Sequence, residues 1–129
     1  MTRDELTGFY DRYNACCNAH RFEDLAEFVA SDVVINGAEH GLDTYAENLR
    51  GVVRGFPDFR WEVRHVLVDP PWIAVRLQDT GTHAATFLDV PATGRTVATE
   101  EFAFYRIDAG LIAEVWGTAF GDRLLHQIR

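Results

Sequence analysis

The spacing of the hydrophobic residues changes near Phe56-Pro57, and this change constrains the fold more than any other feature of the chain. Before this point apolar residues recur every three or four positions, which predicts amphipathic helices; beyond it they alternate with polar residues, which predicts strands. The predicted helices run from a Thr2 cap to Cys17, from Arg21 to Ala30 and from Gly41 to Gly55, and the predicted strands cover residues 33–35, 59–68, 72–80, 96–107 and 111–120. Turn residues separate the last four strands, so these strands should form hairpins.

This order of elements predicts an α+β fold in which three N-terminal helices pack on a curved antiparallel sheet. Such a sheet, wrapped around helices, encloses a cone (an α+β barrel) whose open end is the natural place for a pocket. Side chains on the concave face of the sheet are therefore the first candidates for chemistry. At 129 residues the chain has room for a single domain, residues 1–129, with one hydrophobic core.

The charge of the chain argues against polyanionic partners. The formal net charge is −8, Lys is absent from the sequence, and the Arg residues are scattered along it. Neither nucleic acid nor an anionic membrane surface is therefore an expected partner. The N-terminal residues lack the apolar core of a signal peptide and no apolar stretch approaches 18 residues, so we expect a cytoplasmic protein. Cys16 and Cys17 are adjacent on a helix, cannot usefully bridge one another, and are expected to be small buried hydrophobes.

Several short motifs occur at the spacing found in a known family. They are Gly81-Thr82-His83, the stretch from Phe87 to Arg95 with its Pro-x-Thr-Gly-Arg end, Glu114-Val115-Trp116, and Leu124-Leu125-His126-Gln127. Together with Phe56-Pro57-Asp58 and Tyr13-Asn14, they resemble the SnoaL-like polyketide cyclases of the nuclear-transport-factor-2-like superfamily. The resemblance covers nearly the whole chain and implies the cone-shaped fold of that superfamily.

The resemblance also shows which family residues are replaced. In relatives that close the fourth ring of anthracyclines by an aldol condensation, an Asp four residues after the Glu-x-Trp motif is the general acid/base. Phe120 occupies that position here, and Asp122 would replace the acid only through a shifted turn. Glu101 and Ala103 stand where those relatives have a Gln and a His that stabilise the enolate.

Strand alternation makes Glu101 the leading catalytic candidate. It shares the predicted concave face with Ala103 and Tyr105, whereas Phe102 and Phe104 take the opposite face. Burial would raise the pKa of the Glu101 carboxyl and make it a usable acid or base near neutral pH; the alternative is a solvated or Arg-paired carboxylate. Because the two phenylalanines need cover, the same register predicts a homodimer through the sheet.

The other site candidates have defined expected roles. They are His83, matching the family's Gly-Thr-His histidine, as a second proton-transfer group; Tyr13 and Asn48, matching pocket-lining positions, as orienting groups; Trp116 and Phe120 as the apolar wall; and Arg76 as a substrate contact or the partner of a surface carboxylate. His65 is expected on the same face as Trp61, Val63 and Leu67. No pair of histidines has metal-ligand spacing, so we expect neither a metal nor a cofactor.

These residues lead to a functional hypothesis with two alternatives. The hypothesis is a cofactor-independent enzyme of secondary metabolism, such as antibiotic biosynthesis, that acts on an aromatic or polycyclic ketone by proton transfer beside the carbonyl. One alternative is cofactor-independent hydroxylation during the tailoring of aromatic polyketides. The other is a non-catalytic small-molecule-binding domain.

Overall fold

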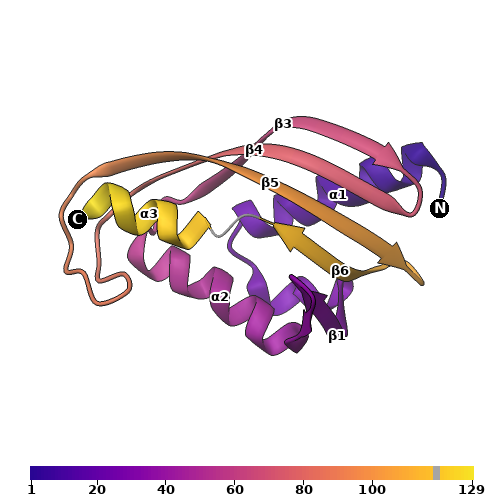
Figure 1. Cartoon of the computed structure of the whole chain (residues 1–129), viewed down its shortest axis with the longest axis horizontal. Helices are drawn as coiled ribbons and strands as arrows, with labels where there is room; N and C mark the ends of the chain where they lie inside the picture. The colour runs from indigo at the N-terminus through magenta and orange to yellow at the C-terminus, as the bar shows by residue number, and fades with distance from the viewer. Residues whose placement is uncertain (118–119) are drawn as a thin grey trace.

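The computed structural model describes residues 1–117 and 120–129, without the side chain of Phe120. In chain order the elements are α1 (Arg3–Asn18), the 3-10 helix η1 (Phe22–Glu27), β1 (Val29–Ile35), β2 (Ala38–Glu39), α2 (Gly41–Gly55), β3 (Arg60–Asp69), β4 (Trp72–Thr82), β5 (Thr96–Asp108), β6 (Leu111–Gly117) and α3 (Phe120–Ile128). Over the described residues, six strands form one sheet in the order β2-β1-β6-β5-β4-β3 (Figure 1). The predicted α+β architecture is confirmed.

Helix α1 begins where the capping pattern predicts. The Thr2 hydroxyl accepts a hydrogen bond from the Glu5 amide at 3.1 Å, and the Glu5 carboxylate accepts one from the Thr2 amide at 2.9 Å. These two bonds satisfy amide groups that have no partner inside the helix. The helix then buries residues three or four apart, among them Tyr10 and Tyr13, so its apolar face packs into the interior.

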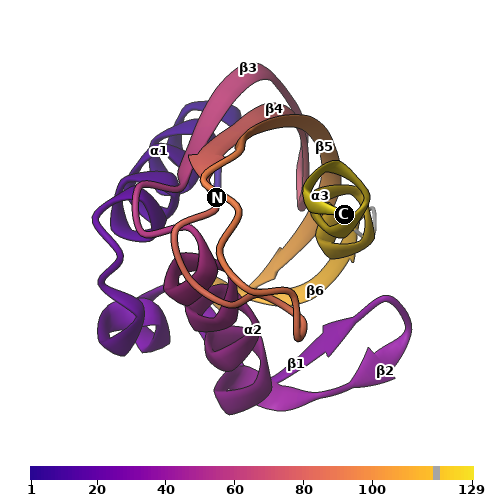
Figure 2. The same ribbon diagram turned by 90° about the vertical axis from the view of Figure 1, so that its left-hand side faces the viewer.

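The sheet curves around the interior, with α1 and α2 on its concave side. Figure 2, which looks along the long axis of Figure 1, shows β3, β4 and β5 arching over one side of the interior and α2 lying across from them. Strands β4 and β5 pair without a register shift, and Leu77 stands opposite Glu101. Alternate residues therefore face the interior without interruption: Ile73, Val75, Leu77 and Asp79 on β4, and Val97, Thr99, Glu101, Ala103 and Tyr105 on β5.

The predicted side-chain alternation is wrong along β3. The register shifts between Val63 and His65, so that Val63 stands opposite Leu77 but His65 stands opposite Arg76. An extra residue in one strand sends every later side chain to the other face. Trp61 and Val63 therefore face inward, whereas His65 and Leu67 face outward instead of sharing their face, and Leu67 is 71% exposed.

The structure departs from the predicted elements in three further places. The expected helix from Arg21 to Ala30 is a shorter 3-10 helix, because Val29 already belongs to β1. Strand β1 runs parallel to β6, so the sheet is antiparallel except at this pair. Of the predicted strand 111–120, β6 covers Leu111–Gly117, residues 118 and 119 lie outside the described residues, and Phe120 belongs to α3.

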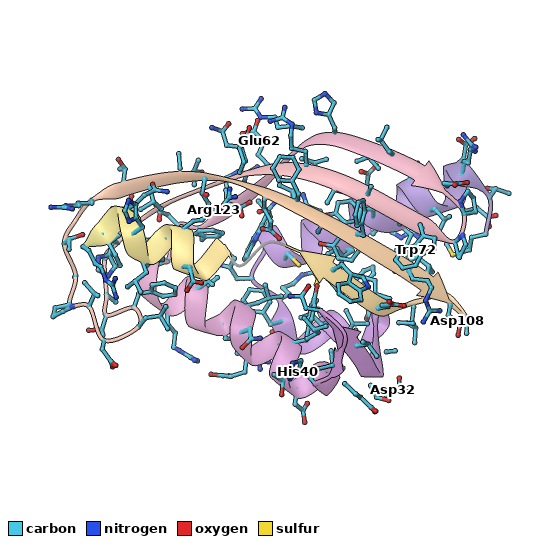
Figure 3. All side chains as sticks on the ribbon, viewed as in Figure 1. Asp32, His40, Glu62, Trp72, Asp108 and Arg123 are labelled. Atoms are coloured by element: carbon cyan, nitrogen blue, oxygen red, sulfur yellow. The ribbon has the colours of Figure 1, made fainter. Side chains whose placement is uncertain are left out.

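Helix α3 closes one end of the sheet. Leu124 and Ile128, four residues apart, are buried, which places the apolar face of the helix on β5. Arg123, drawn between α3 and β5 in Figure 3, donates to the Glu100 carbonyl at 3.1 Å, and Gln127 accepts from the Ala98 amide at 3.0 Å. No helix in the described parts of the chain is long and apolar enough to cross a membrane.

Candidate functional site

A cavity of about 630 Å³ lies between the concave face of the sheet and the two long helices. Its volume falls within the range of small-molecule sites, about 300–1,000 Å³. The wall comes from α1, α2, the inner faces of β4, β5 and β6, and the β4–β5 loop (residues 83–95), which contributes Thr86, Phe87 and Leu88. Apolar and aromatic side chains form most of this wall, and Trp61 of β3 is among them.

All four tyrosines of the chain line this cavity. They are Tyr10 and Tyr13 of α1, Tyr45 of α2 and Tyr105 of β5. The Tyr13 and Tyr45 hydroxyls are hydrogen-bonded to each other, and Tyr10 is hydrogen-bonded to Tyr105. In a pair of hydroxyls one donates to the other, and the accepting hydroxyl keeps a proton that it can donate to another group. Each pair can therefore present a hydrogen-bond donor to the cavity.

The cavity wall keeps these groups protonated. Burial raises the pKa of each tyrosine above its usual value, because removal from water penalises the phenolate. Burial likewise raises the pKa of the Cys17 thiol to about 12. At neutral pH the hydroxyl groups are thus neutral donors, suited to a carbonyl or an enolate oxygen.

Glu101 borders the cavity from β5, on the concave face that alternation predicts. Its side chain is half-buried, and its Oε1 atom is shielded from solvent and has no hydrogen-bond donor among the described residues. Burial raises the pKa of the Glu101 carboxyl. An ionised Glu101 in turn raises the pKa of Tyr10, Tyr45 and Tyr105, which shows that this carboxyl lies close to the tyrosines.

Asp79 of β4 is a second inward-facing carboxyl, and the sequence analysis missed it. It is 0% exposed, and neither of its carboxyl oxygens meets a protein donor within the described chain. Asp79 stands opposite Thr99, which places it diagonally beside Glu101 on the same face. The two carboxyl groups lie within hydrogen-bonding reach of each other, so a bond forms between them once one of them carries a proton. Asp79 does not line the cavity and so lies behind Glu101.

Tyr13 and Asn48 both line the cavity, as predicted, but at different depths. Tyr13 is buried, whereas Asn48 is an exposed residue of α2. Glu47 and Arg54, also exposed residues of α2, line the same part of the wall and form an ion pair with each other. Charged and amide groups therefore surround the outer part of the cavity, and phenols and one carboxyl surround the inner part.

Two of the predicted substrate contacts lie on the other face of the sheet. Trp116 is 42% exposed and donates from its indole nitrogen to Glu114 at 2.7 Å. Arg76 forms an ion pair with Glu100 at 2.7 Å and donates to His65 at 3.0 Å. Both residues line an outer groove instead of the cavity, because they occupy the outward positions of their strands. The other predicted wall residue, Phe120, has its side chain outside the described part of the structure.

His83 is buried in the core and does not line the cavity. Its Nδ1 atom accepts a hydrogen bond from the Thr93 amide at 3.2 Å and lies 2.9 Å from the Thr93 hydroxyl, while its ring packs 5.3 Å from that of Phe56. Its backbone amide and carbonyl bond to Arg95 and Gly94, at the far end of the β4–β5 loop. This placement makes His83 an anchor of the loop and separates it from the predicted proton transfer.

The residues brought together do not form a metal site. Over residues 1–117 and 120–129, no group of three or more His, Cys, Asp or Glu side chains is arranged to hold a metal ion. The cavity instead offers hydrogen-bond donors and one carboxyl within an apolar wall, which suits a ligand with a flat apolar body and a polar oxygen.

A curved sheet that encloses a small-molecule cavity with helices is the architecture of the nuclear-transport-factor-2-like class. The model of the SnoaL-like polyketide cyclase family matches residues 7–128, and the chain belongs to this family. A SnoaL-like polyketide cyclase from Agrobacterium tumefaciens is 31% identical, with a TM-score of 0.79 over 93% of this chain and 97% of that one.

More distant structures share the fold. IdmH from Streptomyces antibioticus, a candidate polyketide cyclase, is 23% identical, with a TM-score of 0.82 over 94% of this chain and 96% of that one. AclR from Streptomyces galilaeus, a candidate hydroxylase, is 22% identical, with a TM-score of 0.82 over 91% of this chain and 76% of that one. The comparison with curated proteins finds no match.

Proposed function

We propose that the protein is a cofactor-independent acid/base enzyme that acts on an aromatic or polycyclic ketone. One observation carries the proposal: Glu101 is a carboxyl with a raised pKa that borders an apolar cavity beside four tyrosine hydroxyls. A general base needs a pKa near the working pH, and an enolate needs hydrogen-bond donors. The cavity supplies both without Phe120, the residue at the position of the family's Asp.

The proposed step is proton transfer at the carbon next to a carbonyl group. The Glu101 carboxylate removes a proton from that carbon, and the electron pair of the C–H bond moves onto the carbonyl oxygen. A free hydroxyl proton from the Tyr13–Tyr45 or Tyr10–Tyr105 pair donates to this oxygen as it gains negative charge. The enolate carbon then attacks a second carbonyl carbon of the same substrate, whose oxygen gains the electron pair of its C=O bond and takes the proton from Glu101. Alternatively, the enolate carbon takes that proton back.

Ligand binding gives the first test of this proposal. Trp61 is a buried residue of the cavity wall, whereas Trp72 and Trp116 are exposed. Titration with α-tetralone, an aromatic ketone, should quench the buried component of the tryptophan fluorescence in a saturable manner. A second titration with an aromatic hydrocarbon of the same ring system should give weaker binding, because it cannot accept a bond from the tyrosines. Equal affinity for the two compounds would argue against a ketone site.

A second candidate function is hydroxylation of an aromatic polyketide by molecular oxygen. The candidate hydroxylase AclR has the same fold. Phe120 also replaces the family's acid/base, which favours a reaction that depends on the reactivity of the substrate and not on an acid/base residue at this position. In this reaction molecular oxygen would add to an electron-rich substrate carbon, and the proton of its C–H bond would pass to the peroxide. Two further electrons from the electron-rich substrate would reduce the resulting hydroperoxide to the alcohol and water. Turnover assays with and without oxygen separate the two functions, since proton transfer continues under nitrogen and hydroxylation stops.

We further propose that the chain forms a homodimer through the outer face of the sheet. Leu67, Ala74, Phe104 and Trp116 stand opposite one another across β3, β4, β5 and β6 and form one row on this face. Phe104 is 57% exposed, and Phe102, Leu67 and Trp116 are exposed around it. Contiguous exposed apolar surface of this kind marks an interaction site. Glu62, labelled in Figure 3, is an exposed acidic residue of β3.

Substitution of Phe104 by Asp should abolish this association. A buried, unpaired carboxylate in each copy of a two-fold interface is costly, so the variant is expected to sediment as a monomer at micromolar concentration. Ala15→Asp, which adds the same charge to the exposed surface of α1, is the matched control and should remain dimeric. A wild-type protein that sediments as a monomer at this concentration would refute the interface.

We also place the protein in the cytoplasm and in secondary metabolism, as a step that follows polyketide chain assembly. The family to which the chain belongs supports this placement. Genes for polyketide synthases beside the gene of this protein would support it further.

A further inference from the structure

Asp79 poses a problem that the proposed reaction does not explain. It is buried on β4 with neither carboxyl oxygen bonded to a donor group, and Oε1 of Glu101 lacks a donor as well, within the described residues. A buried carboxylate without a partner is strongly unfavourable. Arg76 pairs with the outward-facing Glu100 carboxylate, and Arg123 donates to the backbone carbonyl of Glu100. Among the described residues no cation forms an ion pair with Asp79 or Glu101.

A single proton resolves the problem for both groups. The register places Asp79 diagonally beside Glu101, and the two carboxyl groups lie within hydrogen-bonding reach of each other. Two ionised carboxylates have only acceptor atoms and repel each other, but a protonated carboxyl can donate to an ionised one. The titratable groups nearest Glu101 are Tyr10 and Cys17 from α1, Tyr45 from α2 and Tyr105 from β5, and all of them are neutral at neutral pH. Tyr13 on the same cavity wall is neutral as well, and the charged groups of the wall, Glu47 and Arg54, pair with each other.

We propose that Asp79 is a positioning residue that shares one proton with Glu101 and so holds the Glu101 carboxyl toward the cavity. This inference rests on the proposed function, in which Glu101 touches the substrate and Asp79 does not. The protonated Asp79 donates to one Glu101 oxygen, which leaves the other oxygen to accept a proton from the substrate. A carboxylic acid that an apolar site keeps neutral can donate in this way.

The electrostatics of the pair agree with this arrangement. Burial and the hydrogen bond to Glu101 raise the pKa of Asp79 to about 10, and burial also raises that of Glu101. In the unfolded chain Asp79 has its ordinary pKa of 3.8. Between these two values the folded protein holds a proton that the unfolded chain has lost, so stability must fall as the pH rises.

Asp79→Asn tests the inference by a measurement that does not depend on turnover. Asn cannot titrate but can donate an amide hydrogen to Glu101. Above about pH 4, the unfolding constant of the wild type, divided by that of the variant, should rise with pH, by up to about tenfold per pH unit, until the folded pair loses its shared proton. Asp58→Asn is the control, because Asp58 is exposed and Thr82 holds its pKa below the usual value. Above the usual pKa of 3.8, Asp58 is ionised in both the folded and the unfolded chain. The unfolding constant of the wild type divided by that of Asp58→Asn should therefore not change with pH there.

A second readout separates positioning from a purely structural role. Because the side-chain amide that Asp79→Asn introduces would favour the ionised form of Glu101, the acid limb of kcat/KM for the ketone should move to lower pH. In the same variant, kcat should fall more than KM changes. If the unfolding constants of wild type and Asp79→Asn change with pH in parallel, so that their ratio stays constant, the two carboxyl groups do not share a proton. An unchanged pH profile of turnover would overturn the positioning role.

Two further outcomes keep this inference distinct from the proposed function. If no ketone is turned over, the proposed function and the positioning role both fail, while the unfolding ratio still decides whether the proton is shared. If Asp79→Asn does not fold, Glu101→Gln replaces it, since the amide introduced by this substitution would donate to Asp79 and allow it to ionise. The same rise in the unfolding ratio is then expected, and its absence overturns the inference.

Discussion

Replacement of Glu101 by Gln is expected to lower the turnover of an aromatic ketone by about a hundredfold or more, the usual contribution of a positioned proton-transfer group. Gln has nearly the same shape and can still donate to Asp79, so the fold and the cavity should persist. It cannot accept a proton from carbon. Steady-state kinetics should therefore show a loss in kcat, while fluorescence titration shows a dissociation constant close to that of the wild type.

The neighbouring residue provides a matched control for this substitution. Glu100 precedes Glu101 on β5, but it faces outward and forms an ion pair with Arg76. Glu100→Gln should leave kcat within about twofold, because exposed ion pairs contribute little to stability and this one lies away from the cavity. If Glu101→Gln keeps full activity, Glu101 is not the acid/base of the reaction, and hydroxylation of the substrate by molecular oxygen becomes the better-supported function.

Truncation of Phe56 to Ala is expected to cost about 3–5 kcal/mol of the free energy of unfolding, as is typical of a buried aromatic residue. Phe56 is 0% exposed, and its ring packs against those of Phe59, His83 and Phe87 at centroid distances of 5.2–6.0 Å. Loss of this ring leaves a space under the β4–β5 loop, whose residue Phe87 forms part of the cavity wall. Affinity for a ketone should therefore fall as well.

Chemical denaturation followed by circular dichroism measures this effect. Leu88→Ala changes an exposed side chain in the same loop and should alter stability by only about 0.5 kcal/mol or less. A loss of less than about 1 kcal/mol for Phe56→Ala would mean that the surrounding rings close the space, in contradiction to the packing described here.

The strands show when sequence alternation predicts side-chain orientation. Along β4 and β5 the pairing has no register shift, so the alternation of Glu101 with Phe102 and of Ala103 with Phe104 translates directly into inner and outer faces. Along β3 a bulge after Val63 reverses the later positions. A bulge is set by the twist and pairing of two strands, which local sequence does not reveal.

The sequence analysis missed the inward position of Asp79, although the sequence contained part of the information needed to predict it. Ile73, Val75 and Leu77 mark the buried face of β4, and Asp79 continues that series, so its orientation followed from alternation alone. The predicted contact on this strand was instead Arg76, which lies on the outer face. The proximity of Asp79 to Glu101 could not be predicted, because it depends on which residues of β4 and β5 stand opposite each other.

The family resemblance predicted the fold better than the site. It indicated Tyr13 and Asn48 through their match to pocket-lining positions of the family, and both lie on the cavity wall. The resemblance also suggested His83. This residue follows the end of β4 and lies outside the cavity wall, where its backbone hydrogen bonds to Gly94 and Arg95 anchor the β4–β5 loop. The convergence of all four tyrosines arises from α1, α2 and β5, and no local motif links these elements.

Hydrogen exchange at the substrate carbon tests the central claim most directly. α-Tetralone is incubated with the protein in deuterium oxide, and nuclear magnetic resonance follows the loss of the proton signal at the carbon next to the carbonyl. We predict exchange that is faster than in protein-free buffer, that saturates with ketone concentration, and that returns to the buffer rate in Glu101→Gln. Saturable binding of the ketone with exchange at the buffer rate would contradict proton transfer by Glu101 and would define the cavity as a binding site without this chemistry.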